Sequence, residues 1–308
     1  MSEGDEIGGP GGRGADRPMS ESDFLAWIKA RQHTTALVEL AAGDDLAVLK
    51  WPADDLLLVG VDQVLDGVHF DSTQHPPRAI GRKAMNRNLS DCAAMGCLPA
   101  AALISVALPS GAGFDYAKEL YRGVLAAGAP FNCPIVGGDT GSWNGKLAMS
   151  VTILGRADGV QPITRKQPRT DDGIYVTGPL GGSIIGRHMG FHPRVHEGRE
   201  LARSGVVTAM IDLSDGLSRD LPRICAGAIL DETTIPIHKD ATVDRADQRT
   251  PLEHALHDGE DYELLFTASA PPPLGTRIGT VTAEEGIRLR RMDGRLEPLV
   301  PMAWEHRL

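Results

Sequence analysis

Cysteine is scarce in this chain, and so are long apolar runs. The 308 residues include four cysteines, Cys92, Cys97, Cys133 and Cys225, none of them in a Cys-x-x-Cys pair. A disulfide framework is therefore not expected, and buried free thiols in a reducing cytoplasm are the simplest interpretation. No stretch approaches the roughly 18 apolar residues of a membrane span, and the N-terminus has no apolar core of signal-peptide length. These absences predict a cytoplasmic protein.

An excess of positive charge is also missing. The chain has 31 Lys and Arg against 41 Asp and Glu, which gives a net charge of -10. Such a charge argues against a nucleic-acid or anionic-membrane partner. If the substrate is itself an anion, metal ions and a few local Arg or Lys side chains must reverse the field at the site.

The chain is long enough for two domains of about 150 residues each. Residues 1–18 hold six glycines and two prolines with few apolar side chains, so we expect a disordered leader. Residues 19–157 alternate β-rich runs with helices expected at 77–95 and 114–129, and form an N-terminal domain. The pattern restarts over 158–308 as a C-terminal α/β domain. The predicted fold class is α/β, with α+β as the alternative description.

Six short acidic motifs, each beside glycine or a small polar residue, indicate the chemistry. We expect them where apolar runs end and the chain turns, which is where α/β enzymes place their sites. Carboxylates gathered in one cleft repel one another unless cations lie between them. Oxygen ligands without a Cys or His cluster favour Mg²⁺, which usually carries substrate phosphates as well. The motifs are Gly43-Asp44-Asp45, Val61-Asp62, Asn88-Leu89-Ser90-Asp91, Gly137-Gly138-Asp139-Thr140, Asp212-Leu213-Ser214-Asp215-Gly216 and Gly259-Glu260-Asp261-Tyr262. Metal-dependent phosphoryl transfer is the leading hypothesis.

Two of these motifs follow recognisable elements. The apolar run 56–61 predicts a strand that ends at Asp62, which would place this carboxylate at the carboxyl edge of a sheet. A strand followed by a solvated turn is an equally good interpretation. On the predicted helix from Pro77, Asn88 and Asp91 are three residues apart and share a face beside an apolar stripe. That placement indicates a partly buried site.

Glycine-rich segments mark two further positions. Gly137-Gly138-Asp139-Thr140 after a short strand would let backbone N–H groups approach a phosphate while the carboxylate binds a metal. No Gly-Lys-Ser/Thr follows, so the segment is not a Walker A motif, and a tight turn is the alternative. Gly178-Pro179-Leu180-Gly181-Gly182-Ser183 has the same ambiguity, and we favour close packing there.

The segment from Asp212 to Gly216 resembles the start of a calcium loop. Gly216 stands at position five and Arg223 at position twelve, where a bidentate Glu is required, so an EF-hand is excluded. Two acids and the Ser214 hydroxyl, after the apolar run 206–211, suit one or two Mg²⁺ and a nucleotide phosphate.

The histidines give a weaker signal. His188, His192 and His196 have helical spacing, but Pro193 interrupts any helix, so a surface or packing role is favoured over zinc. His69, after the Asp66-Gly67-Val68 turn, is the one histidine kept as a candidate.

Taken in order, these motifs resemble the thiamine-monophosphate kinase family, in the superfamily of aminoimidazole-ribotide synthetase. The resemblance covers residues 20–308. It implies a two-domain fold with a β-rich N-terminal domain that forms homodimers. It also implies ATP-dependent, Mg²⁺-dependent phosphorylation of thiamine monophosphate to thiamine diphosphate, with no general base. The most specific matches are 88–91 with 93–96, 137–140, 211–217 and 259–264.

The resemblance also assigns roles to residues. The metal ligands are Asp45, Asp62, Asp91, Asp139, Asp212 and Asp215. The ATP contacts are Gly138, Asp139, Arg165 and Ser214. The contacts to the substrate are His69, Glu260 and Trp304, whose indole suits stacking on a flat ring.

Three departures from the family pattern bear on these roles. Gly60 and Val61 stand where the family has two hydroxyl residues, which leaves the number of metals open. The segments 190–198 and 225–236 are short, and the Trp304 match rests on few residues. Two alternatives therefore stay in view: another ATP-dependent synthetase of the superfamily, or a degenerate nucleotide-binding protein. Selenophosphate or hydrogenase-maturation chemistry is disfavoured, since it relies on a reactive residue near the N-terminus or a C-terminal Cys.

Overall fold

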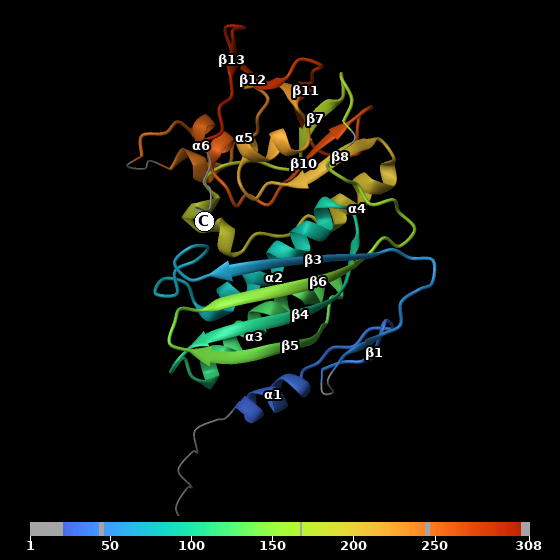
Figure 1. The fold of residues 1–308 in the computed structure, drawn as a ribbon. Helices are drawn as coiled ribbons and strands as arrows, with labels where there is room; N and C mark the ends of the chain where they lie inside the picture. Colours follow the sequence, from blue (N-terminus) through green and yellow to red (C-terminus); the bar gives the residue numbers. More distant parts are fainter. Residues whose placement is uncertain (1–20, 43–45, 167, 244–246, 303–308) are drawn as a thin grey trace, which may run out of the picture.

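The computed structural model describes residues 21–42, 46–166, 168–243 and 247–302. Two sheets form the body of the molecule, and helices α2 (Pro77–Ala94) and α4 (Val195–Ser204) lie where the two halves meet (Figure 1). The predicted leader 1–18 and two predicted site residues, Asp45 and Trp304, fall outside the described residues. The domain boundary at 157/158 stays a prediction.

The N-terminal half is a four-stranded sheet with helices on one face. Its strand order is β3-β6-β4-β5, with β4 and β5 parallel and the other neighbours antiparallel. Helix α2 and helix α3 (Phe114–Gly128) cover one face and confirm the helices predicted at 77–95 and 114–129. The strands are β3 (Leu57–Leu65), β4 (Leu98–Pro109), β5 (Ile135–Trp143) and β6 (Ala148–Arg156).

The other face of this sheet is only partly covered. A small hairpin of β1 (Val38–Leu40) and β2 (Val48–Leu49) packs over Ala101 and Val136. Beyond the hairpin, the β3 side chains of Leu57, Val59 and Val61 are 52%, 64% and 64% exposed. The sheet therefore keeps an apolar outer face. Helix α1 (Glu21–Lys29) packs at the α3 side, where Phe24 contacts Tyr121 edge to face.

Two acidic motifs lie inside strands rather than at their ends, so the expectation that they mark turns is wrong for them. Strand β3 continues to Leu65, which places Asp62 in mid-strand opposite Val151 of β6. Strand β5 runs straight through Gly137, Gly138 and Asp139. Gly138 is needed for close approach, because an added Cβ would lie 1.9 Å from the Ile104 carbonyl oxygen on β4.

The C-terminal half is a seven-stranded sheet of order β13-β12-β9-β11-β7-β10-β8. Its neighbours are antiparallel except β12 and β9. The strands predicted at 174–177, 206–211 and 264–267 are confirmed, and four others were not foreseen. The strands are β7 (Gly173–Val176), β8 (Val207–Asp212), β9 (Gly227–Asp231), β10 (Leu264–Ala268), β11 (Thr276–Val281), β12 (Gly286–Arg290) and β13 (Leu296–Pro298), and the short helices are α5 (Leu217–Asp220) and α6 (Pro251–His257).

One apolar core joins the two halves. Ile80 and Leu89 of α2 belong to the same buried cluster as Leu201 of α4, Met210 of β8 and Phe266 of β10. Helix α2 therefore packs against its own sheet, against α3 and against the C-terminal half. The four cysteines are buried free thiols, as predicted. No described helix has the length and apolar character needed to cross a membrane. The cytoplasmic location stays a prediction.

Two glycines let α2 and α3 approach closely. An added Cβ at Gly123 of α3 would lie 2.0 Å from the Arg78 carbonyl oxygen, and one at Gly81 of α2 would lie 1.9 Å from that of Leu120. These contacts are with backbone atoms, so a methyl group at either position forces the helices apart.

We predict that Gly123→Ala lowers the free energy of unfolding by about 3 kcal/mol, because overpacking a tight interface displaces backbone. Urea unfolding followed by circular dichroism measures it. Gly190→Ala is the matched control, since nothing lies within 4 Å of a Cβ built at Gly190. Equal stability of the two variants would contradict the prediction.

Candidate functional site

Helix α2 carries a row of charged side chains into the molecule. Lys83, Arg87 and Asp91 are four residues apart, so they lie one above another on one helical face. Lys83 is fully buried, and the Arg87 side chain is 13% exposed. Asn88, also buried, accepts a hydrogen bond from the Asp62 backbone N–H through its Oδ1. The face of this helix that was expected to be partly buried is thus buried.

Three of the predicted metal ligands lie near one another. Asp62 is on β3, Asp91 on α2 and Asp212 at the end of β8. Burial, followed by the charges of Asp212 and Asp62, raises the pKa of Asp91 to about 8. Burial also raises the pKa of Asp212, which accepts a hydrogen bond of 2.7 Å from Ser90 Oγ. The two sheets therefore bring together carboxylates that repel one another.

This cluster fits a hard divalent cation in its chemistry. Asp91 accepts no hydrogen bond from the described part of the chain, and the oxygens of Asp91 and Asp212 are ligands that Mg²⁺ prefers. Within the described residues, no three His, Cys, Asp or Glu side chains already converge as a complete metal site. Further ligands would have to come from substrate phosphates or water, as is usual for Mg²⁺.

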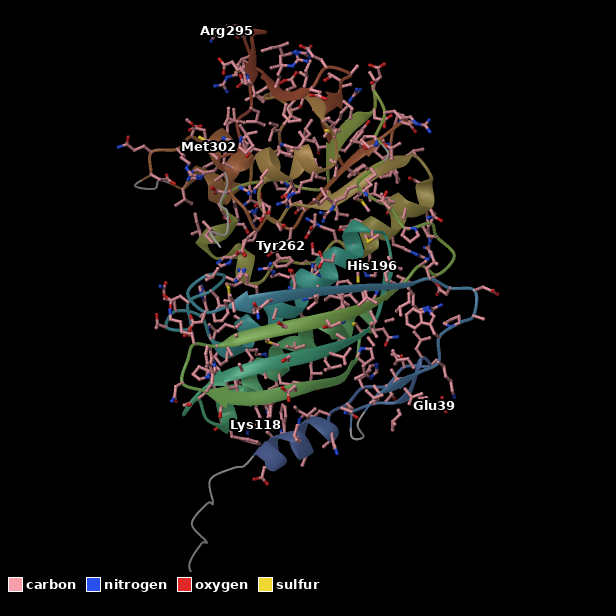
Figure 2. The ribbon with its side chains drawn as sticks, viewed as in Figure 1. Glu39, Lys118, His196, Tyr262, Arg295 and Met302 are labelled. Carbon is pink, nitrogen blue, oxygen red and sulfur yellow. The ribbon has the colours of Figure 1, made fainter. Side chains whose placement is uncertain are left out.

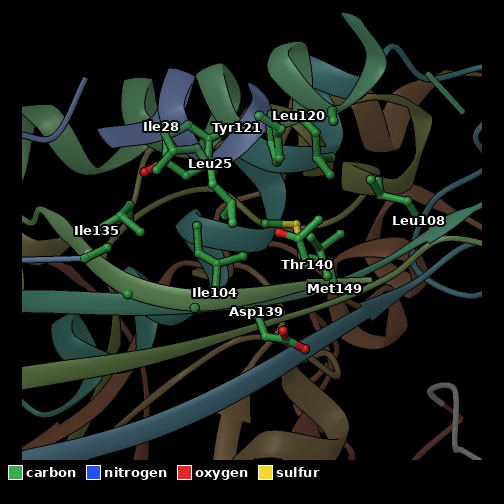
Figure 3. A pocket seen from close by; sticks show the side chains of 16 residues that line it. Leu25, Ile28, Ile104, Leu108, Leu120, Tyr121, Ile135, Asp139, Thr140 and Met149 are labelled. Atoms are coloured by element: carbon green, nitrogen blue, oxygen red, sulfur yellow. The ribbon is translucent and has the colours of Figure 1, made fainter. Parts of the chain in front are cut away.

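Two other predicted ligands point elsewhere. Asp139 lies on β5, the edge strand opposite β3, and its side chain points away from Ile104 and Thr140, to the outer face of the sheet (Figure 3). Side chains alternate along a strand, so an acid next to Thr140 takes the other face. Asp215 forms an ion pair of 2.6 Å with Arg223. Asp139 therefore does not join Asp91 and Asp212 within one chain, and the Asp215 carboxylate already has a cationic partner.

The remaining predicted ATP residues take different positions. Gly138 lies beside Ile104 inside strand β5, so the expected turn after the strand is absent at this position. Arg165 is exposed on the segment between the two sheets, and its charge acts to lower the pKa of both Asp91 and Asp212. Ser214 follows β8 directly.

A pocket of about 300 Å³ lies between the halves. Four predicted site residues line it: His69, Ser214, Asp215 and Glu260. Arg87, Arg249 and Tyr262 line it as well, and Figure 2 shows Tyr262 at the level where the two sheets face each other. The walls combine cationic, anionic and aromatic groups, which suits a ligand with both phosphate and ring parts.

Glu260 is held as a carboxylate at one wall of this pocket. Lys83 Nζ lies 2.5 Å from Glu260 Oε2, and His188 Nδ1 lies 2.8 Å from the same oxygen. Burial opposes the charge, but His188 and Lys83 outweigh it and lower the pKa of Glu260 to about 2. Burial in turn lowers the pKa of Lys83 to about 8, although Glu260 acts against this shift. Glu260 stays charged at neutral pH.

Hydrogen bonds hold both the ring and the backbone of His69. Its Nδ1 accepts a hydrogen bond of 3.0 Å from the Leu65 N–H, so the neutral ring carries its proton on Nε2. Its carbonyl oxygen accepts a hydrogen bond from Lys83. The His69 ring lines the pocket.

The segment that presents Glu260 is strained. Glu260 and Tyr262 have φ of 64° and 53°, values that non-glycine residues seldom adopt. Tyr262 stacks on Phe191 with ring centroids 3.9 Å apart, and the Glu260 N–H donates to the Ser214 carbonyl oxygen. Surrounding contacts therefore impose this backbone, which is common at ligand sites.

The other acids of this motif have structural partners. Asp261 accepts hydrogen bonds from the Gly181 N–H and from Arg187, and Arg194 forms a two-pronged pair with Glu263. An added Cβ at Gly181 would lie 2.6 Å from the Ala255 nitrogen, which confirms the packing role favoured for the glycine-rich turn.

Sequence reasoning missed Lys83, Arg87 and His188. The four-residue spacing of Lys83 and Arg87 before Asp91 was an available signal, because it places all three on one helical face. His188 was assigned a surface or packing role. It is buried against Lys83 and Glu260, and no local pattern marks a residue whose partner lies in a distant element.

The fold and site define a protein of the AIR synthase type. The model described as "AIR synthase related protein, N-terminal domain" matches residues 43–157. A crystal structure of hydrogenase maturation protein HypE in complex with ATP aligns with a TM-score of 0.68 over 85% of this chain and 89% of its own, at 17% identity, which supports the fold alone.

Closer relatives identify the family. The thiamine-monophosphate kinase of Rhodopirellula baltica is 40% identical, covering 93% of this chain and 97% of that protein. The crystal structure of thiamine-monophosphate kinase from Stenotrophomonas maltophilia K279a is 29% identical, with a TM-score of 0.73 over 89% of this chain and 96% of its own. AaThiL complexed with AMPPCP and TMP is 28% identical, with a TM-score of 0.73 over 93% and 96%. The chain belongs to the thiamine-monophosphate kinase family.

The raised pKa of Asp91 predicts a pH dependence of stability. Between about pH 4 and 8 the folded chain keeps a proton on Asp91 that the unfolded chain loses, so the free energy of unfolding falls as pH rises through this window. Asp91→Asn removes this slope. Without metal, we expect it to be more stable than wild type by about 2 kcal/mol at pH 8, and by less at pH 5.

Urea unfolding in chelator at the two pH values measures this difference. Asp54→Asn is the control, because that side chain is exposed and forms no ion pair with a described residue. The prediction fails if the advantage of Asp91→Asn does not grow with pH.

Proposed function

We propose that this chain transfers the γ-phosphoryl group of ATP to thiamine monophosphate and releases thiamine diphosphate and ADP. Family membership over nearly the whole chain is the observation that carries the proposal. The pocket lined by Arg87, Ser214 and Glu260 supports it, because its walls combine cationic, hydroxyl and anionic groups that suit phosphates and a charged ring. AaThiL is complexed with AMPPCP and TMP together.

The reaction needs no general base. The acceptor phosphate is already ionised at neutral pH, so one of its oxygens forms the new bond to the γ-phosphorus. The bond from this phosphorus to the β,γ-bridging oxygen breaks, and the electron pair leaves with ADP. The protein has to align two polyanions and neutralise their charge.

Magnesium ions would supply much of this neutralisation. We propose Asp91 and Asp212 as their central ligands, since these buried carboxylates lack a contacting cation in the described chain. The family resemblance offers Asp45, Asp62, Asp139 and Asp215 as further ligands. Ser214, Arg165, Gly138 and Asp139 are the proposed contacts to ATP.

Glu260 and His69 are the proposed contacts to thiamine monophosphate, with Trp304 as the third. Thiamine carries a cationic thiazolium ring and an aminopyrimidine. Glu260 offers a carboxylate that stays charged, and His69 offers an imidazole ring at the pocket wall. Both line the same pocket as Ser214.

Incubation of the purified protein with ATP, Mg²⁺ and thiamine monophosphate, with thiamine diphosphate followed by chromatography, tests the proposed function. We expect product from the wild type and a loss of at least about 100-fold in kcat for Asp91→Asn. Arg82→Met, an exposed change on the same helix, is the control. If the wild type binds an ATP analogue but yields no product, the kinase proposal is wrong for this acceptor.

We also infer a homodimer formed through the outer face of the four-stranded sheet. Leu57, Val59 and Val61 leave large apolar side chains exposed in a row on β3. Such a row is typical of a contact surface. Asp139 lies on the same outer face, so a second copy packed there would cover it.

Light scattering after gel filtration measures the mass. We expect a dimer for the wild type and a monomer for Val59→Glu, because a charge buried in an apolar interface is costly. Met292→Glu is the control, at a side chain that is 83% exposed on the far half. A dimeric Val59→Glu would overturn the inference.

A further inference from the structure

The Arg87 guanidinium lies between two acids of different proposed roles. Its Nε is 2.9 Å from Asp62 Oδ2, and its Nη1 is 3.9 Å from Glu260 Oε1. The side chain lines the 300 Å³ pocket together with His69 and Glu260. The terminal nitrogens make no hydrogen bond to a described residue, because only Nε donates. A largely buried arginine thus keeps donors available beside the proposed phosphate path.

Of the three neighbouring carboxylates, only that of Asp62 contacts a cation among the described residues. Asp62 receives a charge-assisted hydrogen bond from Arg87. Asp212 receives only the neutral Ser90 hydroxyl, and Asp91 receives nothing from the described residues. The uncompensated negative charge, where an added cation would bind, therefore lies at Asp91 and Asp212.

The two residues before Asp62 also lack side-chain oxygens. A Cβ built at Gly60 lies 4.0 Å from Asp91 Oδ2, so position 60 faces the carboxylates but presents no oxygen. Val61 points to the outer face, where it is 64% exposed. Mg²⁺ requires near-octahedral oxygen coordination. The surroundings of Asp62 provide a guanidinium in place of these ligands.

We propose that Arg87 takes the place of a divalent ion beside Asp62 and binds oxygens of the transferred phosphoryl group, so that Asp62, unlike Asp91 and Asp212, holds no metal. This inference rests on the proposed function. A planar guanidinium can hold a carboxylate on one edge and phosphate oxygens on another. Arg87 moves no proton, and the bonds formed and broken at phosphorus are those given above.

Counting bound Mn²⁺ tests the inference independently of turnover. Titration of each protein with Mn²⁺ in the presence of AMPPCP, followed by electron paramagnetic resonance, gives the number of ions per chain after subtraction of those bound to free nucleotide. We expect Asp62→Asn to bind as many ions as the wild type, and Asp91→Asn to bind fewer. Fewer ions in Asp62→Asn would show that Asp62 holds a metal, and would overturn the inference.

Arg87→Met provides the complementary measurement. Removing the guanidinium leaves Asp62 without its cation, and nucleotide oxygens and water can supply the other ligands, so we expect one more Mn²⁺ per chain than in the wild type. We also expect kcat to fall about 100-fold at low Mg²⁺ and to recover in part as Mg²⁺ is raised. Arg82→Met, exposed on the same helix, should match the wild type in both measurements.

An unchanged ion count in Arg87→Met, with an unchanged Mg²⁺ requirement, would overturn the inference. If Arg87→Met does not fold, the Asp62→Asn count decides the question alone. Absence of kinase activity in the wild type would instead overturn the proposed function. The ion counts would still show whether arginine or metal neutralises Asp62.

Discussion

The buried ion pair between Lys83 and Glu260 is the interaction on which the site depends. It joins α2, a helix of the N-terminal half, to the segment before β10, and so fixes α2 against the C-terminal sheet. Two charges taken out of water need close partners, and His188 and the His69 carbonyl oxygen complete the set. The same contacts hold the strained backbone of Glu260, so the pocket wall is formed before any ligand arrives.

The charges of Asp91 and Asp212, by contrast, are not neutralised by their neighbours. Asp91 and Asp212 are buried near each other without a contacting cation, a state that costs stability. Asp62, on β3, already forms an ion pair with Arg87. A site that is neutralised on one side and negative on the other accepts cations where the phosphates have to be bridged. Cations bound at these two acids would relieve their repulsion and so stabilise the folded chain.

Much of the fold was predictable, because helices and strands follow local periodicity. Helices α2 and α3 were placed within a residue or two, and so were strands β7, β8 and β10. The end of β3 was predicted too early, because Val64 and Leu65 extend the apolar alternation past Asp62. Asp139 was expected beside the other acids. Its face depends on the register between β5 and β4, which no local pattern records.

The sequence by itself determined the chemistry of the residues and their local order. Helical geometry alone places Lys83, Arg87 and Asp91 on one face, because four residues make about one turn. The tertiary structure decided which charge meets which. Lys83 and Glu260 are 177 positions apart in the chain, and they meet because an apolar core packs α2 against the far sheet. Local spacing follows from backbone geometry, whereas partners across the molecule follow from packing that the whole chain shares.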